Sequence, residues 1–444
     1  MQLIDGIRID KNSRVAFVGA GGKSTSMFRL AQQYQGKCIL STSTHLALAQ
    51  VKLADQHIIV GNIADLDQLH NDLPDGITLI SGPKWRNDRV GALSDEIFQE
   101  LDQLAAKHQV PILIEADGSR RLPLKSPGNH EPAIPPIVNT VVVLVGFSGL
   151  GMPLNEKNVH RPELFSKRTG LEMGELIEKK HLLDLVLHPE GGLKNIKEGM
   201  KKVLFLNQAD TNSLVTIASS MSPAILKKYD QVVVGSLNKM NDEIHIRHHR
   251  VAGIVLAAGG SERLGEPKQL LDWKGTPFIR AVVMKAIAAG LDQVVVVTGA
   301  FSEKTSKAVQ GLPVKIIHNE NWSEGQSTSV KKGIESLDQN IGAAVFLLVD
   351  QPQVSSTLIK KLIETYSISK EPIIGTLVDG QRGNPVLFDR STFADLGNIQ
   401  GDKGGRQIFS KYPVRWMPWL DQIMALDVDN PGDYEKLLNF KEQK

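Results

Sequence analysis

The chain has 444 residues, of which 41% are hydrophobic and 23% charged, and its formal net charge is +2. This length is too great for a single hydrophobic core, so we expect two domains. The nearly balanced charge argues against a surface that binds nucleic acid, and the single cysteine, Cys38, excludes an intramolecular disulfide framework or a thiolate-rich metal site. No stretch reaches the roughly 18 consecutive apolar residues of a membrane span, and no signal peptide is evident, so we expect a cytoplasmic protein that binds no membrane.

Short β-branched apolar runs alternate with longer helical patterns along the whole chain, which is typical of α/β proteins with mostly parallel sheets. The run Val-Val-Val-Leu-Val at 141–145 does not alternate with polar residues, so we expect helices on both faces of its sheet. In the first half, the predicted strands are 14–18, 38–41, 77–80, 111–115, 140–145, 203–206 and 231–234. In the second half, they are 253–256, 293–297, 314–317, 344–349, 372–375 and 423–426.

The segment 237–250 is polar and charged, and a new strand-loop-helix unit begins directly after it. We therefore expect a first domain at 1–240, a linker at 241–250 and a second domain at 251–444. Three histidines of this segment, His245, His248 and His249, suggest a metal site, but no cysteine or carboxylate accompanies them at ligand spacing. Solvated side chains of a linker are the favoured interpretation.

Residues 15–25, Val-Ala-Phe-Val-Gly-Ala-Gly-Gly-Lys-Ser-Thr, predict a strand, a glycine turn and the start of a helix. Gly-Lys-Ser at a helix N-terminus is the phosphate-binding core of a P-loop, in which the lysine binds phosphates and the serine binds Mg²⁺. This loop is shorter than the standard one, because Phe17 stands where the pattern requires its first glycine, and a plain glycine turn is the alternative. The candidate phosphate-binding residues are Gly19, Gly21, Gly22, Lys23, Ser24 and Thr25.

Two apolar strands of the first half end in polar residues. One ends in Glu115-Ala-Asp117, as does a strand that holds metal or water beside bound phosphates. The other is followed by Asn207-Gln-Ala-Asp210, which resembles the guanine-reading Asn-Lys-x-Asp of GTPases, with Gln208 in place of the lysine. The acids and the asparagine are candidates for an ATP or GTP site, although a plain strand-to-helix turn explains Asn207 and Asp210 equally well.

A long polar loop at 117–132 contains three basic residues, Arg120, Arg121 and Lys125, together with a histidine and a glutamate. Beside a nucleotide, this combination suits an anionic substrate, and a plain surface loop is the alternative. His45 also follows a strand end, and we expect it to face the same site.

The segments 19–25, 41–45, 115–132 and 159–161 together resemble the YqeC family of selenium-dependent molybdenum hydroxylase accessory proteins, over about residues 1–235. Ser41 and Ser43 are mild departures from the Thr-Thr-Thr-x-His that is common in that family. The resemblance implies the pathway in which this half of the chain acts, but it does not define the reaction. The implied step is nucleotide-dependent and serves the maturation of a molybdenum hydroxylase, for example by loading or delivering selenium or sulfur.

The strongest motif is Leu-Ala-Ala-Gly-Gly-Ser-Glu-Arg-Leu-Gly-Glu-Pro-Lys at 256–268, between a predicted strand at 251–255 and a predicted helix at 278–289. Its glycines let the backbone approach a triphosphate closely and point N–H groups at it. Arg263 and Lys268 supply fixed positive charge for the α- and β-phosphates and the leaving pyrophosphate. A glycine-rich turn without function is the alternative, which the additional Arg and Pro-Lys disfavour.

Carboxylates at two further places complete a candidate metal site. An apolar strand ends in Asp350, at the edge where α/β proteins bind ligands, and a carboxylate there can hold Mg²⁺ against triphosphate oxygens. Asp427 and Asp429 lie on the same side of an extended segment, and Pro431 then begins the last helix. One of this pair would complete the site with Asp350, whereas a helix cap with solvated acids is the alternative.

These residues together resemble the MobA-like nucleotidyltransferases, and among them the MocA-type molybdenum cofactor cytidylyltransferases, over about residues 251–439. The match covers 256–268 without a gap and continues at 319–329, 350–352, 382–385, 401–406 and 427–431. The resemblance implies a Rossmann-like domain with a mixed, mostly parallel sheet, beside the P-loop-like α/β domain of the first half. It implies Mg²⁺ held by Asp350, Asp429 and Asp427, and nucleotide binding by Leu256, Ala257, Ala258, Gly259, Gly260, Ser261, Arg263, Lys268 and Ser329.

The implied reaction is Mg²⁺-dependent cytidylyl transfer from CTP to molybdopterin, the molybdenum cofactor, with release of pyrophosphate. The terminal phosphate of the acceptor would attack the α-phosphorus in line, with Arg263, Lys268 and Asp350 as the catalytic residues. Ala258 is typical of the cytidine-using branch, since the guanosine-using branch has a second glycine there. The pterin would lie near 383–385 and 401–406, where Asn384 replaces the histidine that is usual in relatives.

Two other functions fit the sequence less well. A sugar-1-phosphate or polyol-phosphate nucleotidyltransferase of the same fold is disfavoured by the segments 350–352 and 401–406. A cofactor chaperone that binds nucleotide and pterin without turnover would not need the metal carboxylates. The expected protein partner is a molybdenum hydroxylase apoenzyme.

Overall fold

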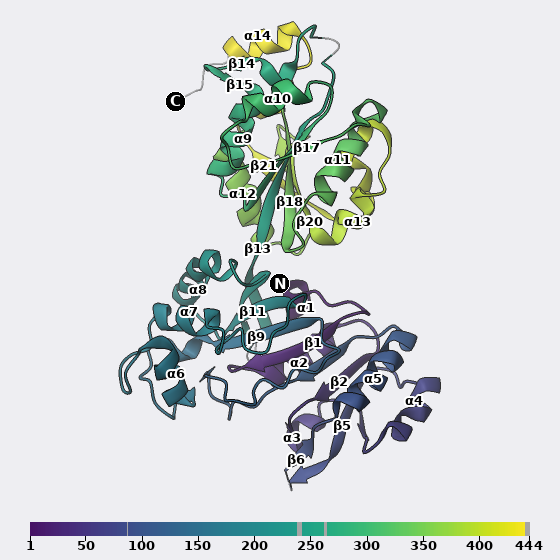
Figure 1. Cartoon of the computed structure of the whole chain (residues 1–444), viewed down its shortest axis with the longest axis vertical. Helices are drawn as coiled ribbons and strands as arrows, with labels where there is room; N and C mark the ends of the chain where they lie inside the picture. The colour runs from purple at the N-terminus through teal and green to yellow at the C-terminus, as the bar shows by residue number, and fades with distance from the viewer. Residues whose placement is uncertain (87, 238–241, 262–263, 440–444) are drawn as a thin grey trace. The chain divides into compact units, whose positions relative to one another are not determined.

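The computed structural model describes residues 1–86, 88–237, 242–261 and 264–439, and the chain divides into two compact units, Met1–His248 and His249–Lys444. Each unit is a sheet with helices packed against it (Figure 1). No helix within these stretches combines the length and the apolar character that crossing a membrane requires.

A parallel sheet forms the centre of the first unit. Its strands are hydrogen-bonded in the order β4–β5–β2–β7–β1–β9–β11–β12, and every pairing among them is parallel. The carboxyl ends of the central strands therefore lie along one edge, where α/β proteins bind ligands. The bounds are β1 (Arg14–Gly19), β2 (Cys38–Thr42), β4 (Gln56–Ile59), β5 (Ile77–Arg86), β7 (Ile112–Glu115), β9 (Thr140–Gly146), β11 (Lys201–Asn207) and β12 (Gln231–Leu237).

Both faces of this sheet are buried, as its uninterrupted apolar runs predict. In β9, Val141, Val143 and Val145 belong to one apolar core, whereas Val142 and Leu144 belong to the other. Successive side chains of a strand point to opposite faces, so both alternating sets must be apolar here. Helices α5 (Asp95–His108), α7 (Lys179–Leu187) and α8 (Asn212–Ile225) contribute to the first core, and α1 (Leu3–Ile7) and α2 (Lys23–Gln33) to the second.

The remaining elements of the first unit are short. β3 (Leu46–Ala47) and β6 (Arg89–Gly91) form an antiparallel extension with the end of β5. β8 (Leu124–Lys125) pairs in parallel with β10 (Val159–His160), which places Lys125 beside His160. The short helices are α3 (Leu48–Val51), α4 (Asp67–Asn71) and α6 (Pro162–Thr169).

The sheet of the second unit is mixed. Its strand order is β17–β16–β13–β18–β20–β19–β21, with β20 antiparallel to both neighbours and the other pairings parallel. The bounds are β13 (Asp242–Ala257), β16 (Gln293–Thr298), β17 (Lys315–His318), β18 (Ile341–Leu348), β19 (Ile373–Val378), β20 (Gln381–Asp389) and β21 (Val414–Trp419).

Helices cover both faces of this second sheet. α9 (Phe278–Ala288) and α12 (Ser356–Ser367) pack into one apolar core, and α11 (Gln326–Glu335) and α13 (Phe393–Leu396) pack into the other (Figure 1). The other elements are α10 (Ser302–Ala308), α14 (Pro431–Asn439) and a hairpin of β14 (Asp272–Trp273) and β15 (Thr276–Pro277). The last helix begins at Pro431, as predicted.

Each predicted strand except 423–426 overlaps a strand of the structure. The strand prediction at 423–426 is wrong, because this segment forms a 3₁₀ turn, η7 (Gln422–Ala425), in which the Asp421 carboxylate accepts a hydrogen bond from the N–H of Ile423 at 3.3 Å. Strands β20 and β21 were not predicted, since Pro385 and Pro418 interrupt their apolar patterns.

The segment 242–250 is not the solvated linker that its charge suggests. It forms the first part of β13, in which Ile244 and Arg247 are fully buried. Its three histidines are half-buried, and burial lowers the pKa of His248 to about 4. The alternation of isoleucine with polar residues at 244–249 is a strand pattern. The linker prediction was wrong because it gave more weight to the charge of the segment than to this alternation.

Candidate functional site

The glycine-rich segment at 256–268, here called the second glycine loop, leaves the carboxyl end of β13. Gln269 is fully buried, and its Nε2 donates hydrogen bonds to the carbonyl oxygens of Ala257 at 3.1 Å and Gly259 at 2.8 Å. The N–H of Lys268 donates to Ser261 Oγ at 3.0 Å. Gln269 thus binds two carbonyl groups that would otherwise repel an anion in the loop. The motif alone did not identify Gln269 as a residue that holds the loop in place.

Lys268 ends this loop and points at a pair of carboxylates. Its Nζ lies 2.8 Å from Asp350 Oδ2 and 3.1 Å from Asp429 Oδ1. Burial lowers the pKa of Lys268, but the two carboxylates outweigh this effect and raise the pKa above its usual value. Asp350 Oδ1 is buried and has no hydrogen-bond partner in the part of the chain that the structure describes. That oxygen is a ready ligand for a cation.

Asp427 belongs to the same cluster. It accepts a hydrogen bond from Gln351 Nε2 at 2.6 Å. Burial of its carboxyl group and the charges of Asp350 and Asp429 raise the pKa of Asp427 to about 6, against the effect of the Gln351 hydrogen bond. The three carboxylates that the sequence indicated as metal ligands therefore influence one another. Among the described residues, no three such groups already surround a common metal position, and the amino group of Lys268 lies between two of them.

Two cavities adjoin this cluster. The smaller has a volume of about 310 Å³ and is lined by the second glycine loop, Asp350 and Trp322. The larger has a volume of about 1140 Å³ and is lined by Asp427 and Asp429, by two cations and by several aromatic rings. The residues that line both cavities are Leu256, Gln326, Leu348 and Asp402. Two molecules bound in these cavities would meet beside Lys268 and the carboxylates.

Most residues predicted to bind nucleotide line the smaller cavity. They are Leu256, Ala258, Gly259, Gly260, Lys268 and Ser329. Ala257 is buried beneath the loop and Ser261 braces it, whereas Arg263 lies outside the described residues. The segments predicted for the acceptor supply Asn384, Asp402, Lys403, Gly405 and Arg406 to the larger cavity.

In the first unit, residues 19–25, here called the first glycine loop, join β1 to α2. Gly19 and Gly21 have φ values of 91° and 88°, in the left-handed region. A Cβ atom at Gly19 would lie 2.3 Å from the carbonyl oxygen of Leu144, and one at Gly21 would lie 2.4 Å from the backbone nitrogen of Gly146. The loop therefore requires glycine at both positions.

Asn207 braces this loop. Its Nδ2 donates to the carbonyl oxygen of Gly21 at 2.7 Å, and its Oδ1 accepts from the N–H of Leu237 at 3.0 Å. Asp210 accepts a hydrogen bond from Ser236. The side-chain groups that the sequence suggested for reading a guanine base are thus engaged within the protein. Neither Asn207 nor Asp210 lines the cavity of about 670 Å³ that adjoins the first glycine loop.

Lys23, at the start of α2, lies in a buried ion cluster. Its Nζ donates to the carbonyl oxygen of Gly19 at 2.7 Å and lies 3.2 Å from Asp117 Oδ1. Asp117 Oδ2 accepts hydrogen bonds from Lys125 Nζ at 2.7 Å and from the N–H of Gly19 at 3.0 Å. The side chains of Lys23 and Asp117 are each 2% exposed, so both charges depend on this pairing.

Ser24 and Glu115 form a second contact beside Lys23. Ser24 Oγ donates to Glu115 Oε2 at 2.5 Å, and burial raises the pKa of Glu115. Both residues line a cavity of about 670 Å³ with Lys23 and Thr25. Hydroxyl and carboxylate oxygens suit Mg²⁺, so this pair fits a cation beside bound phosphates. Asp117, which the sequence placed in the same role, does not line the cavity and stabilises Lys23 instead.

The wall of this cavity includes residues from distant segments. His45 lines it, as expected, and stacks on Trp85 with ring centroids 4.8 Å apart. His160, Arg161 and Gln208 line it as well. Trp85 was not identified from the sequence, because it belongs to no motif. Gln208 was noted only as a departure from the Asn-Lys-x-Asp pattern, although its side chain lines the cavity.

Comparisons with known proteins match different families to the two parts of the chain. Residues 15–163 match the family described as YqeC protein, and residues 253–416 match the family described as MobA-like NTP transferase domain. Over 199 residues the chain is 33% identical to "Uncharacterized protein YqeC" of Escherichia coli (strain K12), which covers 44% of this chain and 75% of that protein.

The second half is similar to proteins with different names. It is 27% identical over 190 residues to "Nicotine blue oxidoreductase" of Paenarthrobacter nicotinovorans, covering 41% of this chain and 90% of that protein. It is 31% identical over 203 residues to a "Probable molybdenum cofactor guanylyltransferase" of Bacillus cytotoxicus, covering 44% of this chain and 98% of that protein. The chain thus belongs to the YqeC family through its first half and to the MobA-like NTP transferases through its second half.

Proposed function

We propose that the second unit transfers a nucleotidyl group from an NTP to molybdopterin, the molybdenum cofactor, and releases pyrophosphate. The observation that carries this proposal is the cluster of Lys268, Asp350 and Asp429 beside two adjoining cavities. A reaction between two anionic substrates needs concentrated charge where they meet. The similarity to a protein named as a probable molybdenum cofactor guanylyltransferase supports the choice of acceptor.

In the proposed reaction, an oxygen of the acceptor's terminal phosphate bonds to the α-phosphorus of the NTP. The bond from that phosphorus to the oxygen bridging to the β-phosphate breaks, and the electron pair leaves with pyrophosphate. Because the attacking phosphate is already anionic, no side-chain nucleophile is needed. Lys268 would hold the α-phosphate and the leaving group, and Lys403 and Arg406 would hold the phosphate of the acceptor in the larger cavity.

Asp350, with Asp429 and Asp427, would hold Mg²⁺, which neutralises charge on the phosphates. The fit of these residues to a divalent cation rests on the unpartnered Oδ1 of Asp350 and on the all-carboxylate donor set. Arg263 stays a candidate for contact with the triphosphate on the basis of the sequence alone.

We further propose that CTP is the preferred nucleotide. Ala258 lines the smaller cavity, and its carbonyl oxygen accepts a hydrogen bond from the N–H of Ala300 at 3.1 Å, which fixes the position of its methyl group. A methyl group there leaves less room for a base than the glycine of the guanosine-using branch would. The relative named as a guanylyltransferase makes GTP the competing nucleotide.

For the first unit, we propose Mg²⁺-dependent binding of ATP or GTP by the first glycine loop. The backbone of the loop, Lys23 and the pair formed by Ser24 and Glu115 support this proposal. The unit would serve the same cofactor, in loading or delivery to a molybdenum hydroxylase apoenzyme, with or without selenium.

The name of the relative from Paenarthrobacter nicotinovorans indicates that the family alone does not decide the reaction. Pyrophosphate release from CTP in the presence of purified molybdopterin separates the candidate functions. A sugar-phosphate or polyol-phosphate nucleotidyltransferase would release pyrophosphate only with those acceptors, and a cofactor chaperone would release none.

Asp350→Asn and Lys268→Ala should each lower kcat/KM for pyrophosphate release by about 10²–10³-fold, the usual effect of removing one preorganised charge from a transition state. The assay uses CTP and purified molybdopterin, with circular dichroism as a check of folding. Lys304→Ala, which removes an exposed lysine of α10, is the control and should leave kcat/KM unchanged. Near-normal turnover in a variant would remove that residue from the mechanism.

Asp427 should make the metal-free protein less stable as the pH rises. Its pKa is about 6 in the folded protein and about 4 in an unfolded chain, so the folded state binds the proton more tightly. Stability is therefore lost between about pH 4 and pH 6 and stays lower above pH 6. In EDTA, Asp427→Asn should raise Tm at pH 7.5, and this gain should shrink toward pH 4.

Scanning calorimetry across this pH range measures the effect. Asp379→Asn is the matched control, because Asp379 is exposed in a left-handed turn position that asparagine also tolerates. A Tm difference for Asp427→Asn that is constant from pH 4 to pH 7.5 would contradict the assignment.

Competition between CTP and GTP in one assay tests the base preference. CTP should be consumed first by the wild-type chain, and Ala258→Gly should reduce the preference, because it removes the methyl group from the cavity wall. Preferential use of GTP by the wild-type chain would disprove the cytidylyltransferase proposal.

Calorimetric titration with ATP and GTP tests the first unit, using the full chain with Lys268→Ala to weaken the second site. Lys23→Ala should abolish Mg²⁺-dependent binding, because the loop N–H groups alone leave most of the triphosphate charge unmatched. Glu115→Gln should weaken the dependence on Mg²⁺, whereas Lys52→Asn should change nothing. If the chain with only the Lys268→Ala substitution bound neither ATP nor GTP, the first glycine loop would be a structural turn and not a nucleotide site.

A further inference from the structure

The cavity of the first unit carries more positive charge than its glycine loop supplies. Arg120 and Arg121 line it from the segment after β7, and Arg161 lines it from the residue after β10. Six lysine or arginine side chains line the cavity, against three carboxylates. Only one of the six cations, Lys23, belongs to the loop, so the excess charge comes from its surroundings.

Part of this charge is already paired. Glu131 accepts hydrogen bonds from Arg161 at 2.6 and 3.1 Å and lies 2.7 Å from Lys125 Nζ. Burial opposes its ionisation, but these cations lower the pKa of Glu131 to about 2. Arg120 and Arg121, in contrast, are exposed, and their side chains form no ion pair or hydrogen bond with any described residue. Their charge is available to a ligand.

The backbone of these arginines is unusual. Arg120, Arg121 and Arg161 have φ values of 51°, 62° and 64°, and Gln208 has a φ of 63°. Ten non-glycine residues have a positive φ among those the structure describes, and four of them line this one cavity. Non-glycine residues adopt this conformation at a cost, and residues held in it cluster at active sites and ligand-binding sites.

The turn that carries Arg120 and Arg121 is fastened to the first glycine loop. The carbonyl oxygen of Leu122 accepts a hydrogen bond from the N–H of Gly21 at 3.2 Å, and the N–H of Leu122 donates to the carbonyl oxygen of Ser119 at 3.0 Å. The two arginines are therefore held close to the residues that would bind nucleotide phosphates.

Two histidines of the cavity indicate the same positive environment. Burial, then Arg161 and Lys125, lower the pKa of His160 to about 4. Burial, together with nearby arginines, lowers the pKa of His45 as well. Both rings are neutral near pH 7 and can donate or accept hydrogen bonds at the cavity wall.

We infer that Arg120 and Arg121 form a second anion subsite, which binds a small phosphorylated molecule beside the nucleotide. This inference rests on the proposed binding of a nucleotide by the first glycine loop, and it makes the first unit a two-substrate site. Guanidinium groups bind phosphate through paired hydrogen bonds, and two adjacent ones match the charge of a phosphomonoester. The nucleotide phosphates would be bound by the loop, Lys23 and the cation at Ser24 and Glu115.

Equilibrium dialysis of the full chain with radiolabelled inorganic phosphate tests the subsite, with and without Mg²⁺ and a saturating non-hydrolysable ATP analogue. The informative variant is Arg120→Asn/Arg121→Asn, because asparagine tolerates the left-handed backbone. This variant should weaken phosphate binding at least tenfold and change the Kd of the analogue less than twofold. Lys23→Ala should weaken binding of the analogue and retain phosphate.

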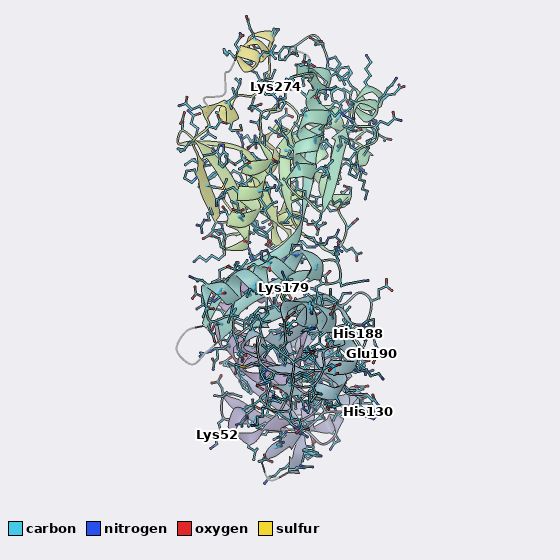
Figure 2. All side chains as sticks on the ribbon, turned by 90° about the vertical axis from the view of Figure 1, so that its left-hand side faces the viewer. Lys52, His130, Lys179, His188, Glu190 and Lys274 are labelled. Carbon is cyan, nitrogen blue, oxygen red and sulfur yellow. The ribbon has the colours of Figure 1, made fainter. Side chains whose placement is uncertain are left out.

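Lys52, labelled in Figure 2, provides the matched control. It is an exposed cation of the same unit that does not line the cavity, so Lys52→Asn should change neither phosphate binding nor the Kd of the analogue. The wild-type chain and these variants share the same second unit, so any phosphate bound there contributes equally to each measurement and is subtracted.

Two results would overturn the inference. One is phosphate binding that the double variant retains in full. The other is phosphate binding that the analogue abolishes in the wild-type chain, since the arginines would then serve the nucleotide itself. Failure of the proposed nucleotide site gives a different result, in which arginine-dependent phosphate binding persists but Lys23→Ala has no effect on the analogue.

Discussion

The ion pair between a loop lysine and the carboxylate near the end of an adjacent strand is the interaction on which both units depend. Lys23 Nζ lies 3.2 Å from Asp117 Oδ1, and Lys268 Nζ lies 2.8 Å from Asp350 Oδ2. The side chain of Lys23 is 2% exposed, and a buried ammonium without a partner would destabilise the fold by several kcal/mol, so the first glycine loop depends on Asp117 to keep its lysine in place. Lys268 is 17% exposed and shares its charge between Asp350 and Asp429. The arrangement of the strands therefore determines where each lysine lies.

The two units divide the carboxylate roles differently. In the second unit, Asp350 both pairs with the lysine and lines the cavity, so one side chain provides the counter-charge and the candidate metal ligand. In the first unit, Asp117 provides the counter-charge behind the loop, and Glu115, two residues earlier, lines the cavity with Ser24. Lys23, the more deeply buried of the two lysines, is thus paired with Asp117. Glu115 is therefore available to a ligand in the cavity.

The features that sequence could predict are those encoded in short segments. Glycine loops, strand-end acids and uninterrupted apolar runs identified most central strands and the residues Lys268 and Asp350. Partners from distant segments could not be assigned in this way. Asn207 stands in a motif that suggests base recognition, yet its amide joins Gly21 to Leu237, which are 186 and 30 residues away. The arrangement of Asp117 behind the loop likewise depends on Lys125, whose position follows from the pairing of β8 with β10.

The pairing of Lys268 with two carboxylates has a thermodynamic consequence for the proposed reaction. A divalent cation bound to Asp350 and Asp429, as proposed, would compete with the ammonium group that lies between them, which would weaken binding of the cation alone. A triphosphate would offer that ammonium another anionic partner and so would release the carboxylates. If the second unit binds metal and triphosphate as proposed, their binding would be positively coupled, and because linkage is reciprocal, each would increase the affinity of the protein for the other by the same factor.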